Sequence, residues 1–166
     1  HPAFVEAENK VQKQLNQFIN QKGTKTAEEF HRELGKILYD KCGLSRSAEG
    51  LKSAISQIQN LRNEYKKNLL VPGDVEDINS ELEKAGRVSD YMELSELMCI
   101  DALNRNESCG AHFREEFQTE DGEAKRDDKN YAYSAAWEWN GDASSPILNK
   151  EPLEFKNVKP TQRSYK

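Results

Sequence analysis

The sequence has few of the residues that build metal sites and disulfide frameworks. Its 166 residues include three histidines and three cysteines, without a CxxC pair. Structural zinc normally needs four ligands in paired spacings, and disulfide scaffolds use an even and denser set of cysteines. We therefore expect no metal centre and free thiols, as is typical of a reducing compartment. Cys99, in the apolar run "LMCI", is expected to be a small buried hydrophobic residue.

Long apolar runs and a large excess of one charge are also absent from the sequence. No stretch of about 18 consecutive apolar residues occurs, so the sequence predicts no membrane-spanning helix. The net charge is only −5, and both signs run along the whole chain. This balance gives no electrostatic reason to expect a nucleic-acid partner or direct binding to an anionic bilayer. Peripheral attachment to a membrane through a partner stays open.

Glycine is scarce as well. The chain has nine glycines, and no Gly-x-Gly-x-x-Gly follows a strand pattern. In dinucleotide-binding folds that motif lets the backbone approach the pyrophosphate. The sequence therefore predicts no dinucleotide site.

Helical periodicity dominates the first two-thirds of the chain. Apolar residues recur at three- and four-residue steps in four segments, and we interpret these stripes as the core of a bundle. The first stripe is Phe4, Ala7, Val11, Leu15 and Phe18, ended by Gly23, and the second is Phe30, Leu34, Ile37 and Leu38, ended near Gly43. Thr26 and Glu29 have the spacing of a capping box and are expected to begin the second helix.

Two further helices are predicted before Asn104. The third runs from about Ser47 to Leu69, and the Pro72-Gly73 pair ends it. Asp74 is expected to cap a long fourth helix whose stripe begins at Ile78 and whose second half, "YMELSELMCIDAL", should lie deeper in the core. Short links between such helices indicate a mainly α fold, an antiparallel helical bundle of three to four helices.

The pattern changes after Asn104. The segment "YAYSAAWEWNG" alternates and is aromatic, which favours a strand, and Asn140-Gly141 is a turn signal. "PLEFKNV" is the expected partner strand, with "SSPILNKEP" crossing between the two. We expect a helical bundle over residues 1–104. Residues 105–166 are then a charged connector and a small C-terminal β-hairpin or irregular appendage packed on the bundle, because an isolated hairpin is marginal in water.

The most suggestive stretch is "NESCGAHFREEFQTEDGEAKRDD", residues 106–128, which combines a thiol, an imidazole and eight carboxylates. A metal site at Cys109 and His112 would need a second Cys/His pair to complete four ligands, and the stretch has none. A nucleophilic thiol at Cys109, paired with His112, would need a positive environment that lowers its pKa, and the nearby carboxylates oppose this. Gly110 is expected to supply a left-handed turn after the fourth helix. Arg114 and Arg126 are expected to make bidentate contacts with Asp127, Asp128 or a facing surface. The residues favour a charged interaction strip.

The chain also resembles a known family. The segments "LGKILYDKCGLSRSAEGLKSAISQIQNLR", "LMCIDALNRNESCGAHFREEFQTEDGEAKRDD" and "AWEWNG" and the terminal "RSYK" are similar to the C-terminal part of the flavoprotein subunit of succinate dehydrogenase and fumarate reductase. The resemblance runs from about residue 2 to residue 166. It is most specific in the charged stretch, where the matching residues are Glu107, Ser108, Gly110, His112, Arg114, Arg126, Asp127 and Asp128. Cys109 departs from the family pattern, which commonly has arginine there.

This resemblance implies that the chain is a non-catalytic part of an oxidoreductase. The parent subunit would exchange a hydride between succinate or fumarate and FAD, and electrons with an iron–sulfur subunit. An anchor subunit would hold that complex at the cytoplasmic face of the inner membrane. The FAD and substrate motifs lie outside this sequence, so we expect the fragment to bind no FAD and to be inactive.

The resemblance also suggests a role for the charged stretch. The domain would support the FAD-binding and capping domains of its parent chain and shape the contact with the iron–sulfur subunit. Ion pairs of the strip would then be shielded in the intact subunit and partly exposed in isolation. The predicted interdomain or subunit interface residues are Arg105, Glu107, His112, Arg114 and Asp127.

Two other interpretations stay open. The chain could be an independent helical module that binds a partner helix in a groove. It could also be the same domain of a sibling flavoenzyme such as L-aspartate oxidase. The start at His1-Pro2, without methionine or a signal peptide, leads us to expect a processed chain or a fragment of a longer polypeptide.

Overall fold

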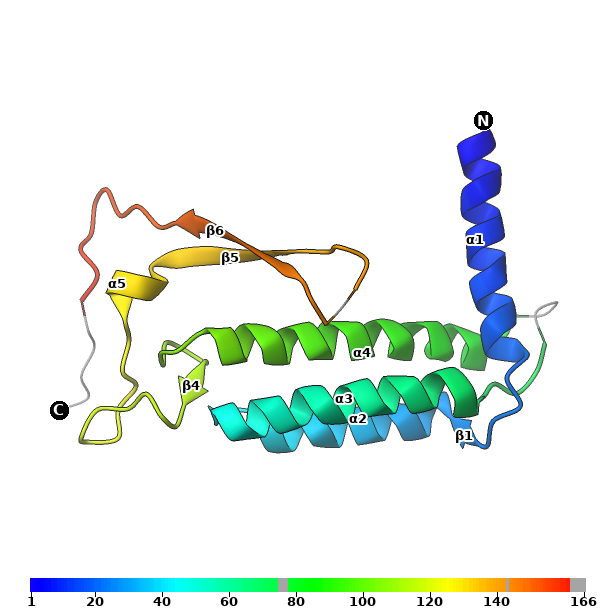
Figure 1. The fold of residues 1–166 in the computed structure, drawn as a ribbon, viewed down its shortest axis with the longest axis horizontal. Coiled ribbons are helices and arrows are strands. Elements are labelled where there is room, and N and C mark those ends of the chain that lie inside the picture. Colours follow the sequence, from blue (N-terminus) through cyan, green and yellow to red (C-terminus); the bar gives the residue numbers. More distant parts are fainter. Residues whose placement is uncertain (75–77, 143, 162–166) are drawn as a thin grey trace. The chain divides into compact units, whose positions relative to one another are not determined.

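The structure is a computed structural model that describes residues 1–74, 78–142 and 144–161, and the statements below refer to these residues. The predicted fold class is confirmed, because the chain is mainly α with a small β appendage (Figure 1). The helices are α1 (Pro2–Ile19), α2 (Ala27–Cys42), α3 (Ala48–Asn68), α4 (Ser80–Asn104) and α5 (Asp128–Tyr131). The strands are β1 (Lys25–Thr26), β2 (Ser45–Arg46), β3 (Leu69–Leu70), β4 (Phe113–Arg114), β5 (Tyr133–Glu138) and β6 (Ile147–Pro152).

The chain forms two compact units, each built from separate segments. The first unit comprises His1–Ile37 and Ser56–Leu94, and the second comprises Leu38–Ile55 and Ser95–Lys166. The helices α2, α3 and α4 each contribute residues to both units. A division into domains at residue 104 stays a prediction.

Tyr65 joins the four helices of the first unit. The rings of Phe18 on α1 and Phe30 on α2 pack edge-on against the Tyr65 ring, with centroid distances of 6.1 and 4.9 Å. The Tyr65 hydroxyl, on α3, donates to the carbonyl oxygen of Ala85 on α4 at 2.7 Å. Burial raises the pKa of this phenol, which therefore stays neutral and keeps its proton for that bond. The core of the unit sits at this crossing point.

The connection from α1 to α2 is held against the end of α3. The strands β1 and β3 pair in parallel, and the amide of Gly23 donates to the carbonyl oxygen of Leu69 at 3.2 Å. A Cβ atom on Gly23 would lie 2.0 Å from the carbonyl carbon of Asn68, so this close approach requires glycine. The predicted capping box then begins α2, because the Glu29 carboxylate accepts from the amide of Thr26 at 2.7 Å.

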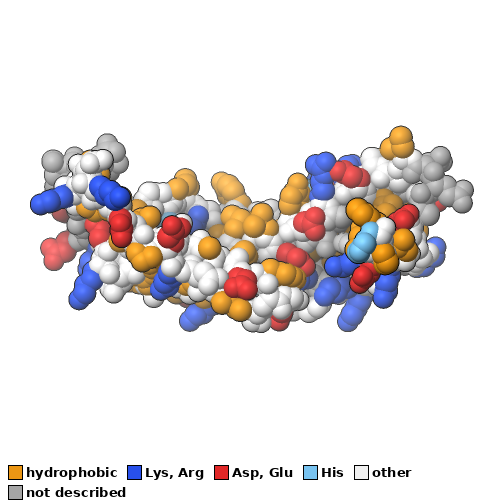
Figure 2. Space-filling model, turned by 90° about the horizontal axis from the view of Figure 1, so that it is seen from above, with side chains coloured by type: hydrophobic (Ala, Val, Ile, Leu, Met, Phe, Trp, Pro, Cys, Tyr) orange, Lys and Arg blue, Asp and Glu red, His pale blue; other side chains and the backbone are white. Residues whose placement is uncertain are grey.

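The apolar stripe of α1 is largely exposed, and its predicted place in the core is wrong. Phe18 is buried, but the side chains of Phe4 and Val11 are 78% and 55% exposed. The reason is that α1 meets the other helices of its unit near its carboxyl end and projects away from them (Figure 1). Figure 2 shows hydrophobic side chains gathered around the free end of α1, which is seen end-on there.

Helix α4 begins later than the sequence suggested. The side-chain oxygen of Asn79 accepts from the amides of Glu81 and Leu82, both at 3.0 Å, so Asn79 rather than Asp74 is the N-cap. Ile78, expected in the helical stripe, lies before the helix with an exposed side chain. Residues 75–77 of the expected helix lie outside the described residues.

The second half of α4 lies deeper than the first half, as the sequence predicted, although it is not buried on every side. Met92, Cys99 and Ala102 are buried, but the side chains of Leu94 and Met98 are 55% and 45% exposed. Cys99 is thus the buried residue that was predicted, and the cysteines of the described chain are free thiols. A wide apolar arc becomes core only where neighbours cover both of its sides.

The β appendage is a hairpin with a different second strand from the predicted one. The strand β5 lies within the predicted segment and pairs antiparallel with β6, from Tyr133 opposite Pro152 to Glu138 opposite Ile147. The strand β6 thus lies in the segment expected to cross, whereas "PLEFKNV" forms no strand beyond Pro152. The predicted turn signal at Asn140-Gly141 lies in the connection between the two strands, where Gly141 has a positive φ of 96°. The Trp137 ring nitrogen donates to Asp101 at 2.7 Å and attaches the hairpin to α4 within the second unit.

Two further predictions concern other parts of the chain. None of the helices in the described residues is long and apolar enough to cross a membrane. The terminal "RSYK" used for the family resemblance lies outside the described residues.

Candidate functional site

The charged stretch between α4 and α5 folds into tight turns within the second unit. Cys109 and His112 exchange both backbone hydrogen bonds, at 2.8 and 3.1 Å. Gly110, with φ of +59°, occupies the turn between them. The predicted left-handed glycine is therefore confirmed, but it lies in this turn and not at the end of α4, which ends at Asn104.

Arg114 caps the carboxyl end of α4. Its side chain is 2% exposed, and its Nη1 donates to the carbonyl oxygens of Ala102 at 2.9 Å and Leu103 at 3.2 Å. The last carbonyls of a helix have no partner inside the helix and carry the negative end of its dipole. A buried guanidinium at this place supplies both the missing donors and the opposite charge.

Glu116 extends this arrangement to the beginning of α3. One carboxylate oxygen accepts from Arg114 Nε at 3.1 Å, and the other accepts from the amide of Ala48, the first residue of α3. Partial burial raises the pKa of Glu116, but the hydrogen bonds from the Ala48 amide, its own amide and Arg114 outweigh this effect. The pKa therefore lies below its usual value, and the carboxylate stays ionised at the positive end of a helix.

Glu107 ties together the two ends of the charged stretch. The side chain is 2% exposed, and its oxygens accept from Arg105 Nε and from the amide of Asp127, each at 2.8 Å. Asp127 is in turn the N-cap of α5, because its carboxylate accepts from the amide of Asn130 at 3.2 Å. Breaking the Glu107 contacts would release both segments.

His112 lies between two arginines, and this position fixes its tautomer. Arg46 Nη1 lies 3.0 Å from Nδ1 of His112, and the carbonyl oxygen of Arg105 lies 3.0 Å from Nε2. Since a guanidinium only donates, Nδ1 must accept and Nε2 must carry the proton. Burial lowers the pKa of His112, and the positive charges of Arg46, Arg114 and Arg105 lower it further, against the hydrogen bond to the Arg105 carbonyl. The imidazole is therefore neutral.

Two contacts at the edge of the network complete its geometry. Arg105 donates from Nη2 to the carbonyl oxygen of Tyr131 at 2.8 Å, and its guanidinium lies 5.7 and 5.5 Å from the ring centroids of Tyr131 and Tyr133. Arg126 makes a bidentate contact with Asp128, both distances being 2.6 Å, as the sequence suggested.

The structure brings the five predicted interface residues together. Arg114 and His112 both contact the carbonyl oxygen of Arg105, at 3.5 and 3.0 Å, and Glu107 links Arg105 to Asp127. The expectation of partial exposure in isolation is wrong for Glu107 and Arg114, because both are buried inside this chain. That the five residues face another domain or subunit stays a prediction.

Two members of the network were missed by the sequence. Neither Arg46 nor Glu116 was among the predicted interface residues. Each reaches its partner across a large sequence separation, from Arg46 to His112 and from Glu116 to Ala48. No local pattern signals such a pairing, although Glu116 lies two residues from Arg114.

The polar side chains of the network are engaged with one another and with the backbone. Both ring nitrogens of His112 are engaged, so the imidazole has no nitrogen left to activate the Cys109 thiol. No cluster of three or more metal-ligating side chains occurs in the described residues. Every buried side-chain nitrogen or oxygen in the same residues has a hydrogen-bond partner. The arrangement thus neutralises helix ends and fixes the connector.

Comparison with known proteins identifies the family of this chain. A family model described as the C-terminal part of the fumarate reductase flavoprotein matches residues 31–165. The fumarate reductase flavoprotein subunit of Proteus vulgaris is 24% identical over 93% of this chain and 25% of its own length. The corresponding subunit of Helicobacter pylori is 27% identical over 89% of this chain and 20% of its own length. The chain therefore spans about a quarter or less of these curated relatives.

A solved structure supports the same fold. The chain aligns with a quinol fumarate reductase structure from E. coli with a TM-score of 0.80 and 23% identity. The alignment covers 98% of this chain and 27% of that chain. At this level of identity the likeness concerns the fold.

Proposed function

Because the chain belongs to the C-terminal family of fumarate reductase flavoproteins, we propose that it is the C-terminal helical domain of an FAD-dependent succinate or fumarate oxidoreductase subunit. The observation that carries this proposal is the family match over residues 31–165. In the proposed parent subunit FAD and the substrate are bound by the remaining part, and residues 1–166 contribute neither a catalytic nor a cofactor-binding side chain.

The proposed role of the domain is to support the flavin part and its contact with an iron–sulfur subunit. The exposed stripe of α1 favours this role, because Phe4 and Val11 offer apolar surface that a neighbouring domain could cover. The buried Arg114 and Glu107 contacts give the second unit a rigid connector. The complex would lie at the cytoplasmic face of the inner membrane, attached through an anchor subunit and not through this chain.

A flavin and activity assay tests the non-catalytic role. The purified chain is mixed with FAD, desalted and scanned for absorbance, and turnover of succinate and fumarate is measured. We expect no retained flavin and no turnover. Stoichiometric yellow flavin or unaided turnover would show that the chain itself holds the redox site.

An assembly assay tests the supporting role. The gene region around the chain is expressed as a whole, together with its iron–sulfur subunit, and compared with a Phe4→Ser/Val11→Ser variant. We expect the variant to assemble poorly in the whole subunit, although the isolated 166-residue chain keeps its melting temperature because both side chains are exposed there. An open reading frame limited to residues 1–166 would favour an independent interaction module instead.

A further inference from the structure

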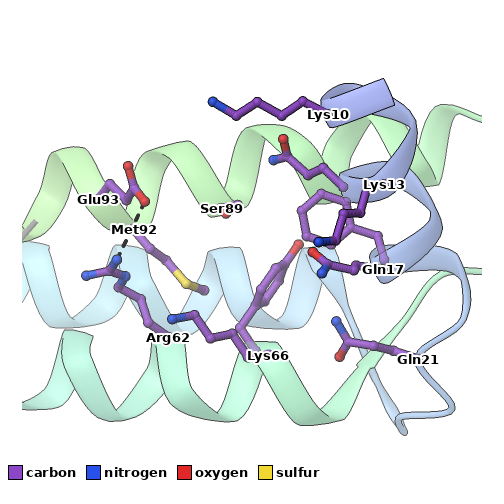
Figure 3. Close-up of a pocket in the computed structure, with 12 residues that line it drawn as sticks. Lys10, Lys13, Gln17, Gln21, Arg62, Lys66, Ser89, Met92 and Glu93 are labelled. Carbon is purple, nitrogen blue, oxygen red and sulfur yellow. Dashed lines mark ion pairs between the residues drawn. The ribbon is translucent and has the colours of Figure 1, made fainter. Parts of the chain in front are cut away.

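The first unit carries an open groove of about 710 Å³. The groove is lined by α1, α3 and α4. Figure 3 shows Lys10 and Lys13 extending from α1, and Arg62 and Lys66 from α3, around the same opening. All lining residues belong to the first unit, so the groove is a feature of one compact body.

The lining is strongly positive, although the chain as a whole carries a net charge of −5. Four cationic side chains face one carboxylate, Glu93, which lies 3.6 Å from Arg62. The ammonium groups of Lys10, Lys13 and Lys66 form no ion pair with a described residue. A concave surface lined by one sign of charge concentrates the potential and attracts an oppositely charged ligand.

The floor of the groove is apolar. Phe18, Tyr65 and Met92 line it and belong to the core of the unit, so their positions are fixed by packing. Figure 3 shows Met92 extending from α4 into the space between α3 and α4. Two glutamines of α1, Gln14 and Gln17, add amide groups at the edge, which can donate to and accept from a peptide backbone.

We propose that this groove binds an acidic peptide segment of a partner protein. One apolar side chain of the segment packs over Met92 and Tyr65, while its flanking carboxylates pair with Lys10, Lys13 and Lys66. A small free anion fits less well, because the lysines reach the groove on long flexible stems and none of them is held by a buried partner. Several carboxylates spread along a chain match cations that come from two helices.

This proposal is independent of the supporting role in the oxidoreductase. It concerns a surface of the first unit, whereas the family match and the buried network do not depend on the groove. Failure of the peptide experiment below therefore leaves the assignment to the flavoprotein family intact, and failure of the assembly assay leaves the groove intact.

Fluorescence anisotropy tests the groove. The 166-residue chain is titrated into an array of labelled peptides of about ten residues, each with several carboxylates around one leucine, methionine or phenylalanine. We expect saturable binding that weakens as salt is raised. The Lys13→Glu/Lys66→Glu variant should bind about tenfold more weakly or worse, because it places negative charge on both sides of the groove.

A matched control variant separates the groove from overall charge. Lys36→Glu/Lys129→Glu changes the net charge equally, and both lysines are exposed and lie outside the groove lining. We expect it to bind the peptide within about twofold of the unchanged chain. Exposed charges that lie away from the groove are screened from the peptide at physiological salt. Melting curves by circular dichroism should show both variants folded, as these side chains are on the surface.

Five results would overturn the proposal. The first is that no peptide binds. The second is that the control variant binds the peptide as weakly as Lys13→Glu/Lys66→Glu does. The third is that a peptide whose apolar anchor is replaced by serine binds with the same affinity as the original peptide. Displacement by inorganic phosphate at the peptide's own concentration would indicate a small-anion site. Concentration-dependent dimers blocked by Lys13→Glu/Lys66→Glu would indicate a second copy of the chain as the occupant.

Discussion

Arg114 and Glu116, bonded to each other at 3.1 Å, cap opposite ends of two different helices. Arg114 supplies donors and positive charge to the last carbonyls of α4, and Glu116 supplies an acceptor and negative charge to the first amide of α3. Each charge complements the helix dipole that it faces, and the ion pair links the two caps. Arg114 lies on the short strand β4, whose parallel pairing with β2 holds it opposite Arg46, and Glu116 follows two residues later.

Removing the Arg114 charge should destabilise the chain clearly. Arg114→Met keeps much of the side-chain volume but leaves buried carbonyls of α4 without donors and Glu116 without its cation. We expect a loss of about 2–3 kcal/mol in the free energy of unfolding, less than for a fully buried pair because Glu116 is partly exposed. Urea denaturation of the 166-residue chain measures this loss.

Arg126→Met provides the matched control for that measurement. Its bidentate contact with Asp128 has shorter distances, but neither side chain is buried, at 28% and 48% exposed. An exposed ion pair contributes about 0.5 kcal/mol, so this variant should unfold at nearly the same urea concentration as the unchanged chain. Equal losses for the two variants would contradict the capping role of Arg114.

Reversing the charge of Glu107 should also destabilise the isolated chain. Glu107→Lys places an ammonium beside Arg105 in a buried position and removes the acceptor for the amide of Asp127. We expect a loss of about 3 kcal/mol or more, measured by thermal and urea unfolding. Glu120→Lys, an exposed carboxylate of the same stretch, should change stability little. An unchanged melting temperature for Glu107→Lys would instead favour the interface that the sequence suggested.

Stability should fall at mildly acidic pH because of His112. Its pKa is lower in the folded chain than the ordinary value of 6.5, chiefly through burial, so the unfolded chain binds the proton more readily. The stabilisation is therefore complete above about pH 6.5 and declines as the pH falls from that value toward the folded pKa. The slope contributed by this one group is at most about 1.4 kcal/mol per pH unit.

Comparison with His112→Gln isolates this effect. Glutamine does not titrate, so the difference in unfolding free energy between the two proteins should shrink between about pH 7 and pH 5. The other histidines, His1 and His31, are present in both proteins and cancel. Parallel stability profiles for the two proteins over this range would show that His112 is not held neutral by its neighbours.

The sequence predicted the features that depend on neighbours within one helix turn. Thr26 and Glu29 form the expected capping box because its three-residue spacing is its whole geometry. The helical stripes also identified α1 to α4, since the 3.6-residue period is local. Their burial was less predictable, because Phe4 has the spacing of a core residue but no element of its unit lies over it.

The candidate site shows the same limit. Family resemblance selected Arg114 and Glu107, but it could not tell whether they lie on a surface or inside the chain. Their burial depends on the end of α4, which lies several residues earlier, and on pairing of β4 with a strand from another part of the sequence. The missed partner Arg46 lies on that strand.

Gly23 offers a stability test for a long-range backbone contact. Gly23→Ala would place a Cβ atom 2.0 Å from the carbonyl carbon and oxygen of Asn68, both backbone atoms that cannot move without disturbing the end of α3. We expect the free energy of unfolding to fall by about 2 kcal/mol or more, because the β1–β3 pairing must shift.

Gly35→Ala is the control, since nothing lies within 4 Å of its Cβ in the exposed middle of α2. Alanine should be stabilising there by about 0.5–1 kcal/mol through helix propensity. Opposite signs for the two substitutions in urea denaturation would establish that the α1–α2 connection packs tightly on α3, and a neutral Gly23→Ala would refute it.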